Sequence, residues 1–245
     1  MFFFKKNKPV LKDIIPDGYT DIHSHLLPGI DDGAKDIEET LYLVKSLKSF
    51  GFESFTTTPH TFSGFYNNTK SGIQKVEAET QKTLTENHIH NPFKAASEYL
   101  LDDHFINLCK AGEVLTIKDN LVLVEMSYLN APIHLYDLLF EMQVAGYKPI
   151  LAHPERYMFY HKKTDEYKKL KNAGCHFQLN LLSTVGYYGN EVMQVADFLL
   201  KTNLIDFVGS DVHHKKHIES FDKKIELKEI DNLKSVIHNN QFFKE

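Results

Sequence analysis

The chain has 245 residues, of which 42% are hydrophobic and 25% are charged, as is typical of one globular domain, and this excludes wholesale disorder. Its formal net charge of -5 gives no reason to expect a nucleic-acid partner, because proteins that bind phosphate backbones usually carry a basic surplus. Cys109 and Cys175 form no CxxC pair, which argues against a disulfide scaffold and a thiolate zinc site and fits a cytoplasmic location.

The ends of the chain carry no membrane signal. No apolar run approaches the roughly 20 residues that a membrane-spanning helix needs, so no stable membrane insertion is expected. The segment Met1–Lys6 is apolar and then basic, but it is too short for a signal peptide. We expect residues 1–16 to form an N-terminal extension and residues 17–245 to form one domain.

Short β-rich runs alternate with amphipathic helical patterns along the whole chain. The expected strands are Tyr19–His25, Ser54–His60, Phe93–Leu100, Asn120–Met126, Lys148–His153, His176–Asn180 and Ile205–Ser210. The expected helices are Ile37–Phe50, Lys70–Asn87, Ile133–Ala145, Thr164–Ala173, Glu191–Thr202 and Glu226–Asn239. This alternation predicts parallel βαβ units in one closed or nearly closed α/β barrel. An open doubly wound sheet is the alternative, but neither a GxGxxG nor a GxxxxGK[ST] loop supports it.

Histidines and carboxylates gather at the carboxyl ends of the predicted strands, where α/β barrels carry their reactive groups. Because side chains on a strand alternate in direction, His23 and His25 point the same way, as do Asp211 and His213. A lone residue of this kind is more often solvated, but a buried set of like charges would repel unless cations neutralised it. The candidate metal ligands are His23, His25, Asp32, His60, Glu98, Glu125, His153, Asp211 and His213.

The ligand types narrow the choice of metal. Imidazole and carboxylate without thiolate suit Mn²⁺, Fe²⁺ or Zn²⁺ better than an all-oxygen Mg²⁺ or Ca²⁺ cage. Nine ligands exceed what one ion needs, so we expect two or three divalent ions with a bridging carboxylate. Such sites lower the pKa of bound water and hold the attacking and leaving oxygens in phosphoryl transfer.

Several nearby residues are weaker candidates. Asp21 shares the inward direction of His23 but could orient a ligand instead of binding a metal. Asp31 is the second choice to Asp32. His134 and His214 are not favoured as ligands. The histidines expected to be solvated are His88, His90, His104, His161 and His238.

Arg156 is the single arginine of the chain and follows His153 by three residues. The arginine side chain presents a rigid fork that matches phosphate, which lysine cannot copy. Arg156 is therefore the candidate for binding a substrate phosphate, and a surface arginine paired with a carboxylate is the alternative.

The runs DIHSHLLPGIDDGAKDIEET, TTTPH, LAHPER and GSDVHH resemble the PHP (polymerase and histidinol phosphatase) superfamily. More narrowly, they resemble the bacterial manganese-dependent tyrosine-protein phosphatases of capsule and exopolysaccharide synthesis. The resemblance implies a distorted seven-stranded β/α barrel over residues 17–245, with three metal ions, Mn²⁺ first and Fe²⁺ or Zn²⁺ as alternatives. It implies that His23, His25, Glu98 and Asp211 hold the first ion, that Glu98 bridges to a second held with Glu125 and His153, and that Asp32, His60 and His213 hold the third.

The resemblance also implies an activity. A metal-bound hydroxide would attack the phosphorus of a phosphotyrosine protein directly, with Arg156, Asp211 and His213 as catalytic residues and Arg156 on the phosphate. A bacterial tyrosine autokinase is a candidate partner. Thiol-dependent tyrosine phosphatases are excluded, because neither cysteine is followed by an arginine six residues on. The alternatives are a small-molecule phosphatase such as histidinol phosphatase, a polymerase-associated nuclease, and a catalytically inert metal-binding scaffold.

Two segments depart from the pattern of the streptococcal relatives. Those relatives carry basic residues just after the second-strand histidine, where this chain has Thr61–Tyr66. They also tend to have an arginine shortly after the DxH motif, where this chain has Lys215, Lys216 and His217. Both departures concern substrate contacts and leave the metal ligands intact.

Overall fold

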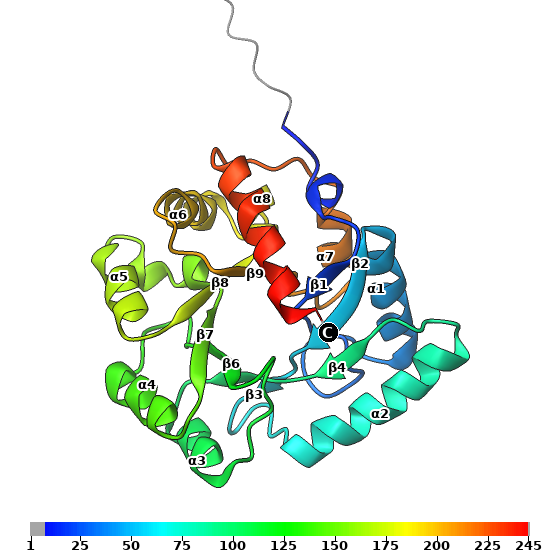
Figure 1. The fold of residues 1–245 in the computed structure, drawn as a ribbon, viewed down its shortest axis with the longest axis horizontal. Helices are drawn as coiled ribbons and strands as arrows, with labels where there is room; N and C mark the ends of the chain where they lie inside the picture. Colours follow the sequence, from blue (N-terminus) through cyan, green and yellow to red (C-terminus); the bar gives the residue numbers. More distant parts are fainter. Residues whose placement is uncertain (1–7, 245) are drawn as a thin grey trace, which may run out of the picture.

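Parallel strands form the centre of the molecule, and helices surround them (Figure 1). The computed structural model describes residues 8–244, and among these the strands form a three-stranded sheet, β1-β2-β4, and a six-stranded sheet, β3-β5-β6-β7-β8-β9. The strands are β1 Tyr19–Asp21, β2 Phe52–Thr57, β3 His60–Thr61, β4 Phe93–Ala95, β5 Glu98–Leu100, β6 Leu121–Glu125, β7 Lys148–Ala152, β8 His176–Asn180 and β9 Phe207–Gly209. The predicted α/β fold with parallel strands is confirmed.

Two of the seven predicted strands are split, so the described residues contain nine strands instead of seven. The run at residues 54–60 breaks before Pro59, which has no N–H to donate to a neighbouring strand. Thr58 N instead donates to Ser24 O at 2.7 Å, and β3 then pairs with β5, where His60 lies opposite Glu98. The run at residues 93–100 splits in the same way, because β4 pairs with β2 while β5 pairs with β6.

The first and last strands approach each other beyond their carboxyl ends. Ser24 forms a parallel bridge with Val212. His25 N donates to Val212 O at 2.9 Å, and Asp211 N donates to His23 O at 2.7 Å. These backbone contacts bring the HxH motif after β1 directly beside the DxH motif after β9.

The helices lie outside the strands, as Figure 1 shows. They are α1 Ile37–Ser49, α2 Lys70–Glu86, α3 Asp103–Ala111, α4 Leu135–Val144, α5 Asp165–Asn172, α6 Asn190–Lys201, α7 Lys215–Ser220 and α8 Ile230–Asn239. Short 3₁₀ turns occupy η1 Lys12–Ile14, η2 Pro154–Arg156, η3 Met158–Tyr160, η4 Leu181–Val185 and η5 Asn240–Phe243. The six predicted helices are present with shifted ends, and α8 begins four residues later than expected. The short helices α3 and α7 were not among the helices that the sequence pattern predicts.

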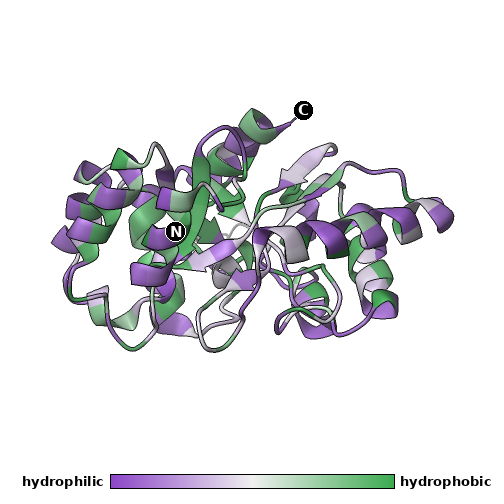
Figure 2. Cartoon of the chain, turned by 90° about the horizontal axis from the view of Figure 1, so that it is seen from below, coloured by the Kyte–Doolittle hydropathy of each residue, from purple (hydrophilic) through white to green (hydrophobic). Residues whose placement is uncertain are grey.

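Apolar side chains fill two layers. On β6, Val122 and Val124 belong to a large cluster between strands and helices, whereas Leu121 and Leu123 belong to a smaller one with Ile150. This alternation follows from the opposite directions of successive side chains on a strand. Figure 2 shows apolar strands in the middle and hydrophilic stripes on the helices around them.

Part of the predicted N-terminal extension packs against the body of the molecule. Leu11 is fully buried, its N–H donates to Lys223 O at 3.0 Å, and Val10 forms an antiparallel bridge with Lys224. The Phe-rich segment Met1–Lys6 lies outside the described residues. Within residues 8–244, none of the helices has the length and apolarity that crossing a membrane requires.

Asn240 joins the C-terminal turn to the first and last strands. Its buried amide donates to Tyr19 Oη at 2.9 Å, Thr20 O at 3.0 Å and Val208 O at 2.8 Å, and its Oδ1 accepts from Val208 N at 3.1 Å. Because Asn240→Ala removes four buried hydrogen bonds, we expect it to lower the free energy of unfolding by about 2–3 kcal/mol, measured by urea denaturation.

The neighbouring Asn239→Ala is the matched control. Its exposed amide makes one bond, to Asp206 O at 2.9 Å, so the expected loss is below about 1 kcal/mol. Equal losses for the two variants would contradict the anchoring role of Asn240.

Candidate metal centre

The nine predicted ligands come together at the carboxyl ends of the strands. Their candidate ligand atoms form overlapping groups, each with its atoms within 4.8 Å of one another. The groups are His23, His25 and Asp211; His23, Glu98 and His153; His60, Glu98 and Glu125; and His25, Asp32, His60 and His213. Residues from separate strands and loops of the two sheets therefore share one neighbourhood.

Glu98 is the central carboxylate of this cluster. Its Oε2 lies 3.1 Å from His23 Nε2, 3.4 Å from His25 Nε2 and 3.4 Å from His60 Nδ1, and its Oε1 lies 3.1 Å from His153 Nε2. The side chain is almost completely buried. A single carboxylate that faces four imidazoles has the position of a bridging ligand.

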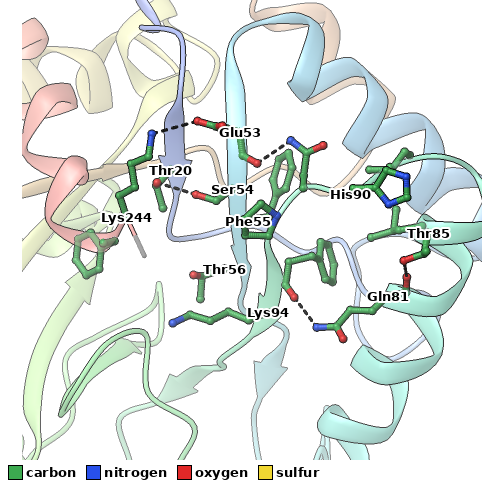
Figure 3. A pocket seen from close by; sticks show the side chains of 16 residues that line it. Thr20, Glu53, Ser54, Phe55, Thr56, Gln81, Thr85, His90, Lys94 and Lys244 are labelled. Atoms are coloured by element: carbon green, nitrogen blue, oxygen red, sulfur yellow. Dashed lines mark hydrogen bonds and ion pairs between the residues drawn. The ribbon is translucent and has the colours of Figure 1, made fainter.

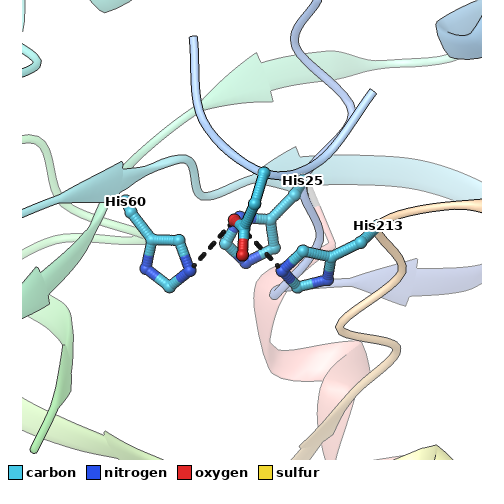
Figure 4. Close-up of side chains that lie close together, drawn as sticks. His25, His60 and His213 are labelled. Carbon is cyan, nitrogen blue, oxygen red and sulfur yellow. Dashed lines mark ion pairs between the residues drawn. The ribbon is translucent and has the colours of Figure 1, made fainter. Parts of the chain in front are cut away.

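Asp32 lies at the open side of the cluster. Its Oδ1 is 3.5 Å from His60 Nε2 and 3.6 Å from His213 Nε2 (Figure 4). The His25 and His213 rings stack with centroids 3.9 Å apart beside it. Asp32 is 52% exposed, so this group faces the solvent, whereas the groups around Glu98 are buried.

The structure groups Glu125 differently from the arrangement that the resemblance implies. Glu125 Oε1 lies 2.9 Å from His60 Nδ1 and forms a group with His60 and Glu98. His153 forms a group with His23 and Glu98 instead of Glu125. Glu98 belongs to both groups, so its bridging position is common to the two arrangements.

Hydrogen bonds at the far side of the rings set the direction of the imidazoles. Gln178 Oε1 accepts from His23 Nδ1 at 2.7 Å, and Asp31 Oδ2 accepts from His25 Nδ1 at 2.7 Å. A proton held on Nδ1 leaves the lone pair of Nε2 directed at the cluster, which is how proteins orient metal-binding histidines. Asp31 therefore orients His25, and this geometry separates it from Asp32, which sequence alone did not.

The backbone is bent to bring the ligands inward. His153 and Asp211 adopt φ of 36° and 50°, in the left-handed region that non-glycine residues rarely occupy. Such conformations persist where the surrounding structure holds them, often at functional sites. Gly33 of the DDG motif packs on His25, because a Cβ there would lie 2.3 Å from His25 O.

Burial and neighbouring charges shift the titration of the cluster strongly. Burial lowers the pKa of His23, but the Glu98 and Asp211 carboxylates outweigh this effect and raise it to about 10. Burial raises the pKa of Asp211, yet His23 and His213 hold it well below its usual range. The carboxylates thus stay ionised at neutral pH and attract positive charge, so cation binding should displace protons from the imidazoles.

The donor set fits divalent cations. His23 Nε2 and His25 Nε2 face each other at 3.4 Å, although both rings already have an acceptor at Nδ1. With their pKa values raised, both rings also carry a proton on Nε2 when no cation is present, and the two N–H groups then face each other, whereas a cation accepts both lone pairs. Ring nitrogens and carboxylates without thiolate match Mn²⁺, Fe²⁺ and Zn²⁺.

Arg156 reaches the same cavity, whose volume is about 240 Å³. Its Nη1 donates to Asp211 Oδ2 at 2.8 Å. Its guanidinium carbon lies 4.1 Å from the ring centroid of Tyr188 and 4.8 Å from that of Tyr128, so two aromatic rings hold it. The arginine is paired with a carboxylate, but inside the cavity and not on the outer surface.

Sequence reasoning missed several residues that line this cavity. Tyr128 and Tyr188 lie in connecting segments, and only contacts in the folded chain reveal them, whereas His217 lies in α7, directly after the DxH motif. Asn180 Nδ2 donates to Asp211 Oδ2 at 2.7 Å and to Tyr188 Oη at 3.1 Å. Asn180 is the last residue of β8, and a polar residue at the carboxyl end of a strand is the sequence signal that could have identified it.

The weaker candidates take other positions. Asp21 accepts from the backbone and hydroxyl of Ser210 at 2.9 and 2.6 Å and belongs to no group of candidate ligands. His214 lines the cavity without joining these groups. His134 is exposed, and so are His88, His90, His104 and His238, whereas His161 is half-buried and bonded to Glu155 O.

A second, larger cavity of about 650 Å³ lies at the amino ends of β2 and β4, away from the cluster (Figure 3). Four of its polar side chains pair with one another: Lys244 pairs with Glu53 at 3.2 Å, and Thr20 bonds to Ser54 at 2.7 Å. Volume alone would suggest this larger cavity as the functional site, but the candidate metal ligands converge at the smaller one.

Comparison with known proteins identifies relatives of this chain. A model of the family described as "Capsular polysaccharide synthesis, CpsB/CapC" matches residues 19–226. The putative tyrosine-protein phosphatase CapC of Staphylococcus aureus is 30% identical over 197 residues, which cover 79% of this chain and 76% of CapC. Tyrosine-protein phosphatase YwqE of Bacillus subtilis (strain 168) is 27% identical over 197 residues, 80% of this chain and 78% of YwqE.

The same fold occurs in a solved structure. It comes from a study of YwqE from Bacillus subtilis and CpsB from Streptococcus pneumoniae, described as metal-dependent tyrosine phosphatases, and superposes with a TM-score of 0.80. The match covers 91% of this chain and 93% of the other at 24% identity, and it shows that the two chains share a fold. The resemblance predicted from the sequence motifs is confirmed.

Metal binding should stabilise the folded chain, because the ligand set exists only after folding. With Mn²⁺ at a hundredfold excess over its dissociation constant, the expected gain is about 2.7 kcal/mol, measured as a shift in thermal unfolding. Glu98→Gln removes the central negative charge and should abolish most of this shift and lower the metal content after dialysis. The exposed Glu86→Gln is the control, and an equal shift in both variants would show that the ions bind elsewhere.

Proposed function

Because this chain belongs to the family described as Capsular polysaccharide synthesis, CpsB/CapC, we propose that it is a metal-dependent tyrosine-protein phosphatase. The observation that carries this proposal is the convergence of nine imidazole and carboxylate groups beside the single guanidinium of the chain. Such a set can hold several cations, and the guanidinium adds a matched partner for a phosphate group.

The proposed cofactors are two or three divalent ions, with Mn²⁺ first and Fe²⁺ or Zn²⁺ as alternatives. The proposed ligands are His23, His25, Asp32, His60, Glu98, Glu125, His153, Asp211 and His213, with Glu98 as the bridge. Bound divalent cations supply a lowered pKa for water and charge neutralisation for the phosphate oxygens. Gln178 and Asp31 keep two of the imidazoles directed at these ions.

Arg156 is proposed to bind the phosphate of the substrate. The Tyr128 and Tyr188 rings pack against the guanidinium, whose N–H groups provide the hydrogen-bonding surface. Asp211 accepts from one edge and thereby fixes its direction toward the ligand cluster. Asp211 and His213 complete the proposed catalytic set.

We further propose that the two sheets form one distorted barrel, in which the contacts of Ser24 with Val212 close the seam between β1 and β9. The distinction from a small-molecule phosphatase such as histidinol phosphatase rests on the named relatives, which are tyrosine-protein phosphatases. A cytoplasmic phosphotyrosine protein, with a bacterial tyrosine autokinase as the candidate, is the proposed substrate.

The two cysteines are unsuited to nucleophilic catalysis. Both are buried, and burial raises the pKa of Cys109 and of Cys175 to about 12, so almost no thiolate exists at neutral pH. Both also belong to the apolar core between strands and helices. A thiol mechanism is therefore not supported.

Hydrolysis of phosphotyrosine should survive alkylation of thiols and stop when a chelator removes the cations. Addition of Mn²⁺ after removal of the chelator should restore the rate, because the ligands remain folded around the site. The measurement is phosphate release under the three conditions in turn. Loss of activity on alkylation, or full activity in the chelator, would contradict the proposed mechanism, and an inert metal-loaded protein would favour a binding scaffold.

Arg156→Lys tests the phosphate contact. Lysine keeps the positive charge but loses the planar fork that two tyrosine rings hold, so kcat/KM should fall about 100-fold. The inhibition constant of inorganic phosphate should rise in parallel, while metal content stays the same. The exposed Lys201→Arg is the control, and an Arg156→Lys enzyme with unchanged phosphate inhibition would exclude this role.

A further inference from the structure

An exposed apolar surface begins at the mouth of the metal-site cavity and continues along α4. We call it the α4 face, and it consists of Leu129, Ile133, Tyr136, Phe140 and Val144, which are 86%, 92%, 42%, 67% and 70% exposed. Single exposed apolar residues are ordinary, but five of them within residues 129–144, three of them spaced by one helix turn, indicate a contact surface.

The helix periodicity shows that α4 is apolar on both sides. Tyr136, Phe140 and Val144 are spaced by four residues and form one outward stripe about 12 Å long. The opposite side packs in the core through Leu135, Leu138, Leu139 and Met142. A helix with only one partner normally carries polar residues on its outer side, so the outward stripe requires an explanation.

The α4 face is continuous with the proposed active site. Tyr128 lines the cavity and covers the Arg156 guanidinium, and Leu129 follows it directly in the chain. The Tyr157 ring lies 6.0 Å from that of Tyr128, and its neighbour Met158 is also exposed. Apolar side chains therefore border the cavity on this side.

A second apolar group borders the cavity at His60. The Tyr66 ring stacks on the His60 ring with centroids 5.5 Å apart, and the adjacent Phe65 is 76% exposed. This is the segment Thr61–Tyr66, which carries no basic side chain. The mouth thus has exposed apolar groups next to two of its lining residues, His60 and Tyr128.

We propose that the α4 face and Phe65 together bind the polypeptide of the substrate protein through apolar residues that flank its phosphotyrosine. This inference rests on the proposed phosphatase function. A small phosphate ester stays within the cavity of about 240 Å³ and leaves both apolar groups uncovered, whereas a polypeptide anchored by its phosphate extends out of the mouth, beside the exposed Leu129 and Phe65.

A second copy of this chain is the competing occupant of the α4 face. The continuity through Tyr128 and Leu129 favours the substrate, because a subunit interface has no need to begin at a catalytic cavity. Phe65 near the His60 side of the mouth favours it as well, since a substrate chain that crosses the cavity reaches both groups.

The test compares two phosphotyrosine peptides of equal length on the Mn²⁺-loaded full chain, one with leucines on both sides of the phosphotyrosine and one with serines. We expect kcat/KM to be about tenfold higher for the leucine peptide. Ile133→Ser/Phe140→Ser and Phe65→Ser should each reduce this preference, while kcat/KM for phosphotyrosine amide stays within about twofold. Tyr42→Ser, an exposed residue on α1, is the matched control and should retain the preference.

Equal rates for the two peptides with wild type, or an undiminished preference in the variants, would overturn the proposal. A dimeric wild type that becomes monomeric in Ile133→Ser/Phe140→Ser without a change in peptide preference would identify the face as a subunit interface, and would also overturn it. Failure of the wild type to hydrolyse phosphotyrosine amide would instead remove the proposed phosphatase function. The wild-type peptide comparison stands even if a variant fails to fold.

Discussion

The structure of this protein depends on a group of ionised carboxylates buried among imidazoles. Glu98 faces four histidine rings, and Asp211 lies between His23, His213 and the Arg156 guanidinium. Groups of this charge are costly to bury unless positive charge is present at short range. Protons on the imidazoles can provide that charge in part, and divalent cations match the directions of the nitrogen lone pairs better. Cation binding at this cluster, as proposed, would therefore be coupled to folding.

The arrangement of strands places these groups. The carboxyl ends of parallel strands face one side of the molecule, and the contacts of Ser24 with Val212 bring the first and last strands together there. The interruption before Pro59 moves His60 onto the six-stranded sheet, opposite Glu98. The interruption that ends β2 thus also brings His60 next to Glu98. Left-handed backbone at His153 and Asp211 turns two further candidate metal ligands toward the cluster.

The sequence was sufficient to predict which residues gather as candidate metal ligands. It was insufficient to predict how the strands pair and which other side chains line the cavity. Position at the strand ends selected His23, His25, Asp211 and His213, because the carboxyl ends of parallel strands meet on one side. The predicted side-chain alternation does not account for them, since all four lie beyond β1 and β9 and Asp211 has left-handed backbone. The division of the predicted strands at residues 54–60 and 93–100 was not predicted, since a β-rich run does not show which neighbouring strand it pairs with. The distinction between Asp31 and Asp32 needed the observed bond to His25 Nδ1. The Tyr128 and Tyr188 rings on Arg156 come from distant loops, and no spacing rule connects them.

The central claim is that shared cations occupy the cluster around Glu98. Anomalous X-ray diffraction at the manganese edge, on crystals grown with Mn²⁺, tests this claim most directly. We expect two or three separate peaks, at least one of them within about 2.3 Å of a ring nitrogen and a carboxylate oxygen of the cluster. Peaks confined to other parts of the molecule, or a single peak that does not contact Glu98, would contradict it.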